Sequence, residues 1–577
     1  MAVKLKVYVN EDDALLFWSV AKPIPECRGF ALQRRKGKGA NPPMDFLLNR
    51  VGFANDAVDA ELDKESEKSA PTKPSNEWPF QRFSWTDHDA NTGDTVSYRV
   101  VPMVGEAGSL TAAEDQASEW SEPRTLGETK GKYKPFFNRG FVMSQFMARY
   151  LKENNLTLAQ FKKQLEKHDE PIRVFLSGDL RKALLQQLAL ADKNGGHVFA
   201  ALFELSDGEL IDALCKLGEN AHVVLANGSV TKRKDETSAD ARARDENEDA
   251  RAKLEQANVD VSEQDRFISP GALGHNKFLV RTDKDQTPLV AWTGSTNWAK
   301  TGLCTQVNNG ILIEDPEVAQ VYRDQWQLLR DSGSAFPEKL VTSNGEPTLV
   351  GEDTPGKVRS TVWFTRVRKG VDLDALRAEV EQARDGILFL MFMPGASGLF
   401  SDVTKRSAEP NLYVRGVVST LPQGRGDESS VEVNLVDGAN HTPLHLDIVE
   451  PRGVAHPFAT FAEEVTRSQF LSGVGHAIIH SKVVVIDPFS ADPTVITGSH
   501  NFSGTASTKN DENFIIVKGD RELAEAYAVN ILGAYAHYRW RAFLGQSHKP
   551  FNGLVDSDEW QASRLKSERR DLKFWGV

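Results

Sequence analysis

Two segments of the chain carry the same polar residues in the same order, 205 residues apart. Each begins with histidine, one further residue and lysine, continues through an apolar run to aspartate, and then reaches glycine, serine and two asparagines. The first copy contains His275, Lys277, Asp283, Gly294, Ser295, Asn297 and Asn309, and the second contains His480, Lys482, Asp487, Gly498, Ser499, Asn501 and Asn513.

The spacing within the two copies indicates an internal repeat. From aspartate to glycine the separation is 11 residues in both copies, and from the first asparagine to the second it is 12. From histidine to aspartate it is 8 in the first copy and 7 in the second, so one residue is inserted in the first copy around Arg281 or Thr282. Agreement at this many positions favours duplication over chance.

The repeated residue types suit the cleavage of a phosphodiester. Lysine ammonium groups and asparagine amides are fixed donors for the phosphate oxygens on which negative charge accumulates. On a strand, residues two apart point to the same side, so each His-x-Lys would deliver an imidazole and an ammonium into one pocket. Ser295 and Ser499 would add hydroxyl donors. One histidine would attack phosphorus while the other protonates the leaving oxygen.

A metal site is the alternative chemistry for these residues. His275, His480 and Asp487 are of types that bind divalent cations. However, a lysine two residues from each histidine would repel such a cation. The sequence therefore favours a metal-independent reaction, and we expect neither a metal ion nor another cofactor.

The two copies resemble the H-x-K-x4-D and G-S-x-x-N motifs of the phospholipase D superfamily. The second copy fits in full, and the first has one extra residue before Asp283. The resemblance spans residues 136–544 and implies two similar α/β lobes about a pseudo-twofold axis, with one active site at their seam. A single chain would then supply the whole site, so a monomer would suffice.

The resemblance also implies roles for individual residues. His275 is expected to be the nucleophile, which forms a phosphohistidine, and His480 the general acid and base. Carboxylates and distal polar residues orient the histidines in this superfamily, so Glu512 and its positional counterpart Asn308 are expected to hold them. The candidate catalytic residues are His275, Lys277, Asp283, Asn297, His480, Lys482, Asp487, Asn501 and Glu512, and the candidate substrate-binding residues are Ser295, Asn308 and Ser499.

Alternating helices and strands must position these motifs. Helical periodicity alternates with apolar, strand-like runs on both sides of the first motif, and the same order recurs before the second. The expected helices cover residues 158–167, 179–191, 209–217 and 399–404, and the expected strands 198–205, 223–226, 387–393 and 412–418. This order predicts mixed β-sheets flanked by helices, in a first lobe at residues 135–345 and a second at 355–577.

Residues 1–127 have a different character. Short β-branched and aromatic runs between turn residues predict an all-β sandwich, with an insertion near residues 36–79. The segment around Trp85, Asp87 and Tyr98 resembles the later strands of a fibronectin type III domain. Such modules commonly dock on other proteins, so a protein partner is expected to bind through this domain.

Composition narrows the class of protein. The 577 residues are 40% hydrophobic and 26% charged, which is ordinary for globular proteins and excludes collagen-like or wholly disordered chains. Three cysteines cannot form a disulfide framework, and no apolar run reaches the roughly 18 residues that span a bilayer. We therefore expect a cytoplasmic protein without a transmembrane segment, although the sequence leaves leaderless secretion open.

The substrate is less well defined than the reaction. The leading hypothesis is hydrolysis of a phospholipid headgroup phosphodiester, or its transfer to an alcohol. The first alternative is a nuclease that cuts DNA or RNA, against which the net charge of −12 weighs modestly. The second is a catalytically weak phosphate-binding scaffold or adaptor that works through the β-sandwich.

Overall fold

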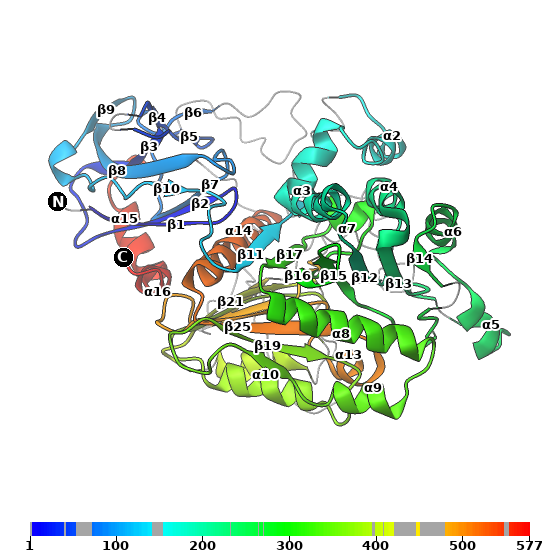
Figure 1. Ribbon diagram of the computed structural model, residues 1–577. Coiled ribbons are helices and arrows are strands. Elements are labelled where there is room, and N and C mark those ends of the chain that lie inside the picture. The colour runs from blue at the N-terminus through cyan, green and yellow to red at the C-terminus, as the bar shows by residue number, and fades with distance from the viewer. Residues whose placement is uncertain are drawn as a thin grey trace. The chain divides into compact units, whose positions relative to one another are not determined.

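The structure is a computed structural model in which the chain forms two compact units, Met1–Glu128 with Gln546–Val577, and Thr129–Gly545 (Figure 1). The structure describes residues 3–39, 42–53, 72–140, 150, 154–230, 232–262, 265–268, 270–394, 398–407, 409–419, 446–449, 479–546 and 553–577.

The N-terminal unit contains two antiparallel sheets. The first has the order β1-β2-β7 and the second the order β10-β8-β3-β4, with β9 paired to β8. Their strands are β1 (Val3–Val9), β2 (Ala14–Val20), β7 (Ser84–Asp87), β3 (Cys27–Lys36), β4 (Met44–Phe46), β8 (Thr95–Glu106), β9 (Ser109–Ala112) and β10 (Arg124–Thr125), and the short β5 (Leu48–Asn49) and β6 (Lys73–Pro74) pair separately. The segment is therefore all-β, as predicted, while its resemblance to a fibronectin type III domain stays a prediction. Residues 54–71 of the expected insertion lie outside the described residues.

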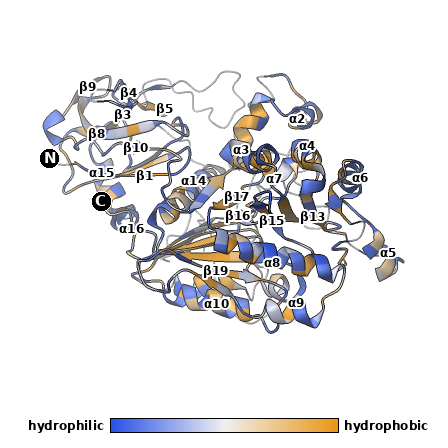
Figure 2. Cartoon of the chain, viewed as in Figure 1, coloured by the Kyte–Doolittle hydropathy of each residue, from blue (hydrophilic) through white to orange (hydrophobic). Residues whose placement is uncertain are grey.

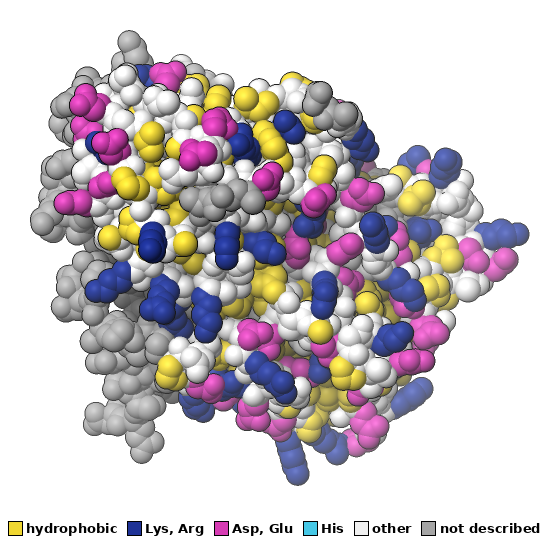
Figure 3. All heavy atoms as spheres, turned by 90° about the vertical axis from the view of Figure 1, so that its left-hand side faces the viewer, with side chains coloured by type: hydrophobic (Ala, Val, Ile, Leu, Met, Phe, Trp, Pro, Cys, Tyr) yellow, Lys and Arg dark blue, Asp and Glu magenta, His cyan; other side chains and the backbone are white. Residues whose placement is uncertain are grey.

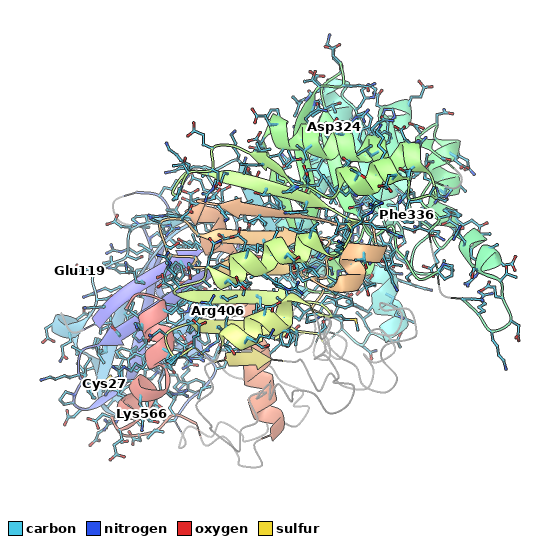
Figure 4. The ribbon with its side chains drawn as sticks, turned by 90° about the horizontal axis from the view of Figure 1, so that it is seen from below. Cys27, Glu119, Asp324, Phe336, Arg406 and Lys566 are labelled. Carbon is cyan, nitrogen blue, oxygen red and sulfur yellow. The ribbon has the colours of Figure 1, made fainter. Side chains whose placement is uncertain are left out.

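The last residues of the chain pack on these sheets. Helices α15 (Trp560–Ser567) and α16 (Arg569–Phe574) supply Trp560, whose ring lies 5.8 Å from that of Phe30, and lead into Trp575, which stacks on Phe17 at 4.9 Å. Figure 4 labels one residue of β3, Cys27, and one of α15, Lys566. The predicted second lobe ran to residue 577, and this end is wrong, because the final segment completes the N-terminal core.

The first lobe of the larger unit is built on a seven-stranded mixed sheet of order β11-β17-β16-β15-β12-β13-β14. Its strands are β11 (Tyr133–Phe137), β12 (Val198–Leu202), β13 (Ala221–Leu225), β14 (Asp260–Val261), β15 (Lys277–Thr282), β16 (Pro288–Gly294) and β17 (Asn309–Ile313). The helices that accompany them are α2 (Leu158–Gln164), α3 (Pro171–Asn194), α4 (Gly208–Leu217), α5 (Ser238–Ala243), α6 (Glu248–Gln256), α7 (Lys300–Cys304), α8 (Pro316–Ser332) and α9 (Glu338–Ser343).

The second lobe repeats this strand order in an eight-stranded sheet, β18-β19-β25-β24-β23-β20-β21-β22. Its strands are β18 (Thr348–Val350), β19 (Arg359–Phe364), β20 (Gly386–Met391), β21 (Tyr413–Val418), β22 (Leu446–Val449), β23 (Val483–Ile486), β24 (Thr494–Gly498) and β25 (Asn513–Lys518), and its helices are α10 (Val371–Glu381), α11 (Leu399–Arg406), α13 (Gly504–Lys509) and α14 (Arg521–Gln546). Read across the sheet from β19 to β22, each strand of the second lobe has a counterpart in the first lobe, read across its sheet from β11 to β14. The predicted fold class of two similar α/β lobes is therefore confirmed.

Helices cover the sheets because the central strands are apolar on both faces. The residues of β12 and β20 are all buried, as expected for strands that lie between two layers of helices. Figure 2 shows the sheet around β19 in hydrophobic colours, whereas α8 and α10 carry both colours. On α8 the buried residues Val318, Tyr322 and Leu329 recur at helical spacing. In the part of the chain that the structure describes, none of the helices is both long and apolar enough to cross a membrane.

Candidate active site

The two histidines stand at equivalent places, just before β15 and β23, and each is anchored to the opposite lobe. The backbone nitrogen of His275 donates to the carbonyl oxygen of Asp511 at 2.9 Å. The backbone nitrogen of His480 donates to the carbonyl oxygen of Val307, also at 2.9 Å. These bonds belong to two parallel bridges between the lobes, so the seam itself sets the position of both histidines.

A carboxylate from the second lobe holds His275. The Nδ1 atom of His275 lies 2.7 Å from Oε2 of the buried Glu512. Burial raises the pKa of Glu512, but His275 and Lys277 outweigh that effect and hold this pKa below its usual value. Because an ionised carboxylate only accepts hydrogen bonds, the imidazole proton sits on Nδ1, and Nε2 keeps its lone pair.

An amide from the first lobe holds His480. The Nδ1 atom of His480 lies 2.9 Å from Oδ1 of Asn308, whose Nδ2 donates to the carbonyl oxygen of Gly302 at 2.9 Å. That second bond fixes the orientation of the amide, so His480 also carries its proton on Nδ1. Asn308 is predicted both to hold a histidine and to bind substrate, and its side-chain contact is with the histidine.

Burial keeps both imidazoles neutral. Burial lowers the pKa of His275 to about 4, with Glu512 opposing the shift and Lys277 adding to it. The pKa of His480 lies well below its usual value because of burial and of the neighbouring Lys482 and Lys277. Lys482 also lowers the pKa of His275, so the pKa of each histidine depends on the lysine of the opposite lobe. The two lobes therefore form one electrostatic site.

Lys277 and Lys482 are buried beside the two histidines. The Nζ atom of Lys277 donates to the carbonyl oxygen of His275 at 2.7 Å, and that of Lys482 to the carbonyl oxygen of His480 at 2.6 Å. Burial lowers the pKa of Lys277 to about 7, and burial together with Lys277 lowers that of Lys482 well below its usual value. Neither ammonium forms an ion pair with any residue that the structure describes, so the pair suits an anionic ligand.

Two phenylalanines make equivalent contacts with the histidine and lysine of the two lobes, and neither of them was identified from the sequence. The ring of Phe203, just after β12, lies 4.7 Å from that of His275 and 4.8 Å from Nζ of Lys277. Phe392, just after β20, lies 4.8 Å from both His480 and Nζ of Lys482. An aromatic face stabilises a nearby ammonium. The signal in the sequence was a phenylalanine at the end of equivalent apolar strands.

The predicted asparagine donors occupy equivalent loops after β16 and β24. Nδ2 of Asn297 donates to Oε2 of Glu204 at 2.8 Å. The Oδ1 atoms of Asn297 and Asn501 are both buried without a hydrogen-bond partner among the described residues. Buried polar atoms of this kind are normally paired in proteins, and an amide oxygen only accepts, so a ligand group that donates a hydrogen bond would satisfy them.

Ser295 and Ser499 have a different role from the predicted one. The hydroxyl of Ser295 donates to Oδ1 of Asn308 at 2.7 Å, and that of Ser499 donates to Oε2 of Glu512 at 2.9 Å. Both serines are fully buried. Each serine therefore orients the residue that holds a histidine and is not placed to donate to substrate.

The predicted catalytic role is wrong for Asp283 and Asp487. Asp283 closes the turn after β15, where its Oδ1 accepts from the backbone nitrogens of Asp285 and Thr287 at 2.9 and 2.8 Å. Asp487 follows β23 and accepts from three consecutive backbone nitrogens, at residues 384–386. Since the histidines precede these strands, the lengths of β15 and β23, roughly 20 and 13 Å, separate the two aspartates from the histidines.

Comparison with known proteins agrees with this geometry. A family model described as a PLD-like domain of cardiolipin synthase matches residues 180–329 and 427–532. A Rickettsia prowazekii protein named phospholipase D is 47% identical over 181 residues, which are 30% of this chain and 82% of that protein. The chain belongs to the phospholipase D superfamily. The resemblance predicted from the two motif copies is confirmed.

Other relatives match shorter parts or only distantly. A Rickettsia felis phospholipase D is 49% identical over 59 residues, so the match covers 10% of this chain and 27% of that protein. The crystal structure of phosphatidylserine synthase from Haemophilus influenzae aligns with 69% of this chain and 92% of that chain, at 12% identity and a TM-score of 0.37.

The irregular first motif of this phospholipase D superfamily member is visible in its sheet. The register of β15 against β16 shifts between Arg281 and Thr282, where the spacing placed the extra residue. The histidine and lysine lie before this point, so the irregularity leaves their geometry equivalent to that of the second copy. Within the described ranges, no group of three or more His, Cys, Asp or Glu side chains lies in position to hold a metal ion.

Proposed function

We propose that this phospholipase D superfamily member hydrolyses phospholipid headgroup phosphodiesters, or transfers the lipid phosphoryl group to an alcohol, through a phosphohistidine. The observation that carries the proposal is the cross-lobe pair of contacts, Glu512 to His275 and Asn308 to His480, around two buried lysines. The arrangement brings two imidazoles, each held through Nδ1, and two lysines together in one site that suits a phosphate.

The proposed first step begins at His275. Its Nε2 lone pair attacks phosphorus, the N–P bond forms, and the bond from phosphorus to the leaving oxygen breaks. The ring then carries positive charge, which Glu512 stabilises from 2.7 Å. An amide could not do this as well, so the nucleophile is assigned to the histidine that contacts the carboxylate.

The proposed acid is His480, which donates a proton to the leaving oxygen and later takes one from water. The attack of that water on phosphorus breaks the N–P bond and regenerates His275. Burial, and after it the positive charge of Lys482 and Lys277, lowers the pKa of His480 in the free protein. A bound phosphate anion offsets that charge, so binding of substrate favours the protonated acid.

Lipid is favoured over nucleic acid as the substrate class. The Rickettsia relatives carry the name phospholipase D. The net charge is −12, and on the face shown in Figure 3 basic and acidic side chains are interspersed. A surface that binds nucleic acid without sequence preference normally gathers basic side chains along one face.

The test is phosphodiester cleavage in EDTA on parallel substrates, namely vesicles of phosphatidylcholine, phosphatidylethanolamine, phosphatidylglycerol or cardiolipin, and single- and double-stranded DNA. We expect turnover of a lipid that is lost in His275→Ala and in His480→Ala and kept in His88→Ala, a half-exposed histidine of the N-terminal unit. Cleavage of DNA alone would replace the lipid proposal with a nuclease. Binding of phosphate without turnover of any substrate would favour the scaffold.

A further inference from the structure

The two halves of the site match closely except at one charged position. Phe203 and Phe392 occupy equivalent places against the two His-Lys pairs. The next residue is Glu204 in the first lobe and Met393 in the second. A carboxylate thus stands beside one half of the site, where the other half has an uncharged thioether.

Glu204 is fixed in place by the loop that carries Asn297. Its Oε2 accepts from Nδ2 of Asn297 at 2.8 Å, and its carbonyl oxygen accepts from the backbone nitrogen of Trp298 at 3.1 Å. The side chain is only partly buried. Its second oxygen, Oε1, has no donor within hydrogen-bond distance among the residues that the structure describes, so one acceptor remains for a ligand.

The charge of Glu204 acts on the phosphate cage. It favours the charged form of Lys277, which burial disfavours, and so raises a pKa that burial holds at about 7. The same charge repels any ligand that brings only negative charge to the site. A phosphodiester that also carries a positive hydrogen-bond donor would relieve this repulsion and satisfy Oε1.

We propose that Glu204 selects phosphodiesters whose alcohol carries a primary ammonium group. The ammonium bonds to Oε1 of Glu204 while the phosphate lies between Lys277 and Lys482. This inference rests on the proposed function and adds the class of headgroup. The negative charge of Glu204 disfavours polyanionic substrates at the same time.

The test compares two soluble lipids that differ in the ammonium group, dihexanoyl phosphatidylethanolamine and dihexanoyl phosphatidylethanol. The readout is the ratio of their kcat/KM values in the wild-type protein and in Glu204→Gln, which keeps an acceptor for Asn297. Loss of one charge-assisted hydrogen bond should lower the ratio about tenfold. The matched control is Glu219→Gln, an exposed carboxylate of the same lobe, for which the ratio should stay unchanged.

The outcomes separate this inference from the function beneath it. A wild-type protein that cleaves neither lipid would overturn the proposed function and this inference with it. A wild-type protein that cleaves both, with the same ratio in Glu204→Gln, would overturn only the role of Glu204. Thermal unfolding of Glu204→Gln at the wild-type temperature establishes that the altered ratio belongs to the site.

Discussion

Lys277 is a residue whose burial suits phosphate binding but lowers the free energy of unfolding. In an unfolded chain a lysine titrates near pH 10.4, whereas burial lowers the pKa of Lys277 to about 7. Between these two values the unfolded chain binds more protons than the folded one. The free energy of unfolding must therefore rise with pH from about 7 to about 10 as far as this group is concerned.

The variant Lys277→Met should be more stable and inactive. Replacing the buried cation by an apolar side chain should raise the free energy of unfolding at pH 7 by about 1 to 4 kcal/mol and flatten its rise towards pH 10. Loss of a phosphate donor should lower kcat at least about 100-fold. Urea denaturation at pH 7 and pH 9 measures the first effect, and Lys182→Met, 77% exposed, is the control. A lower free energy of unfolding for Lys277→Met than for the wild-type protein at pH 7 would show that the buried lysine does not destabilise the fold.

At the scale of elements, a buried ion pair joins the segment before β15 to the segment before β25. Arg266 binds Asp511 through two hydrogen bonds of 2.9 Å, and both side chains are almost fully buried. Asp511 also accepts from the backbone of His275 and precedes Glu512 in the chain. The pair therefore holds the nucleophile and its carboxylate in one arrangement across the seam.

Breaking this pair should be costly, and removing both charges less so. Arg266→Met leaves Asp511 buried without its partner and should cost about 3 to 5 kcal/mol of stability. The double variant Arg266→Met with Asp511→Asn should recover more than about 1 kcal/mol in a denaturation cycle. As a control, Arg368→Met removes an exposed ion pair with Glu338 and should change stability by less than about 0.5 kcal/mol. Additive effects of the two buried changes would contradict the coupling.

Elements were predictable from the sequence where periodicity was unambiguous, and their cross-lobe contacts were not. The strand expected at 387–393 and the helix at 399–404 correspond to β20 and α11. The strand expected to reach residue 205 ends at Leu202, because Phe203 and Glu204 leave the sheet to line the site. Motif spacing gives order along a chain, so it could not show that Asp283 and Asp487 lie at the wrong ends of their strands. Nor could it show which lobe's polar residue faces which histidine.

At the scale of the whole molecule, the C-terminal segment Gln546–Val577 belongs to the same compact unit as Met1–Glu128. Nε1 of Trp560 donates to the carbonyl oxygen of Cys27 at 3.0 Å, and the side-chain amide of Gln561 pairs with the backbone of Ile24 at 2.9 and 3.0 Å. Sequence periodicity gives no indication of the sheet on which α15 packs. The sandwich core is therefore built from segments more than 450 residues apart.

The C-terminal segment should be required for the stability of the N-terminal unit. Trp560→Ala removes a ring packed against Phe30 and Phe83 and should cost this unit about 3 to 5 kcal/mol. Hydrogen exchange of the amides in β3 and β8 measures the effect, with Trp560→Phe as the milder control. Exchange in β15 and β23, which belong to the other compact unit, should not change. Unaltered protection of β3 would mean that the sandwich folds without the tail.

The central claim is that His275 becomes covalently bonded to phosphorus while His480 moves protons. The direct measurement is a denaturing quench at alkaline pH, in which the N–P bond survives, of His480→Ala with ethyl p-nitrophenyl phosphate, followed by peptide mass spectrometry at the same pH. The leaving group of this substrate departs without a proton. Because the base needed for hydrolysis is absent, the adduct should accumulate on His275, and none should form in His275→Ala. An adduct on His480 in the wild-type protein, or turnover by His275→Ala, would contradict the account.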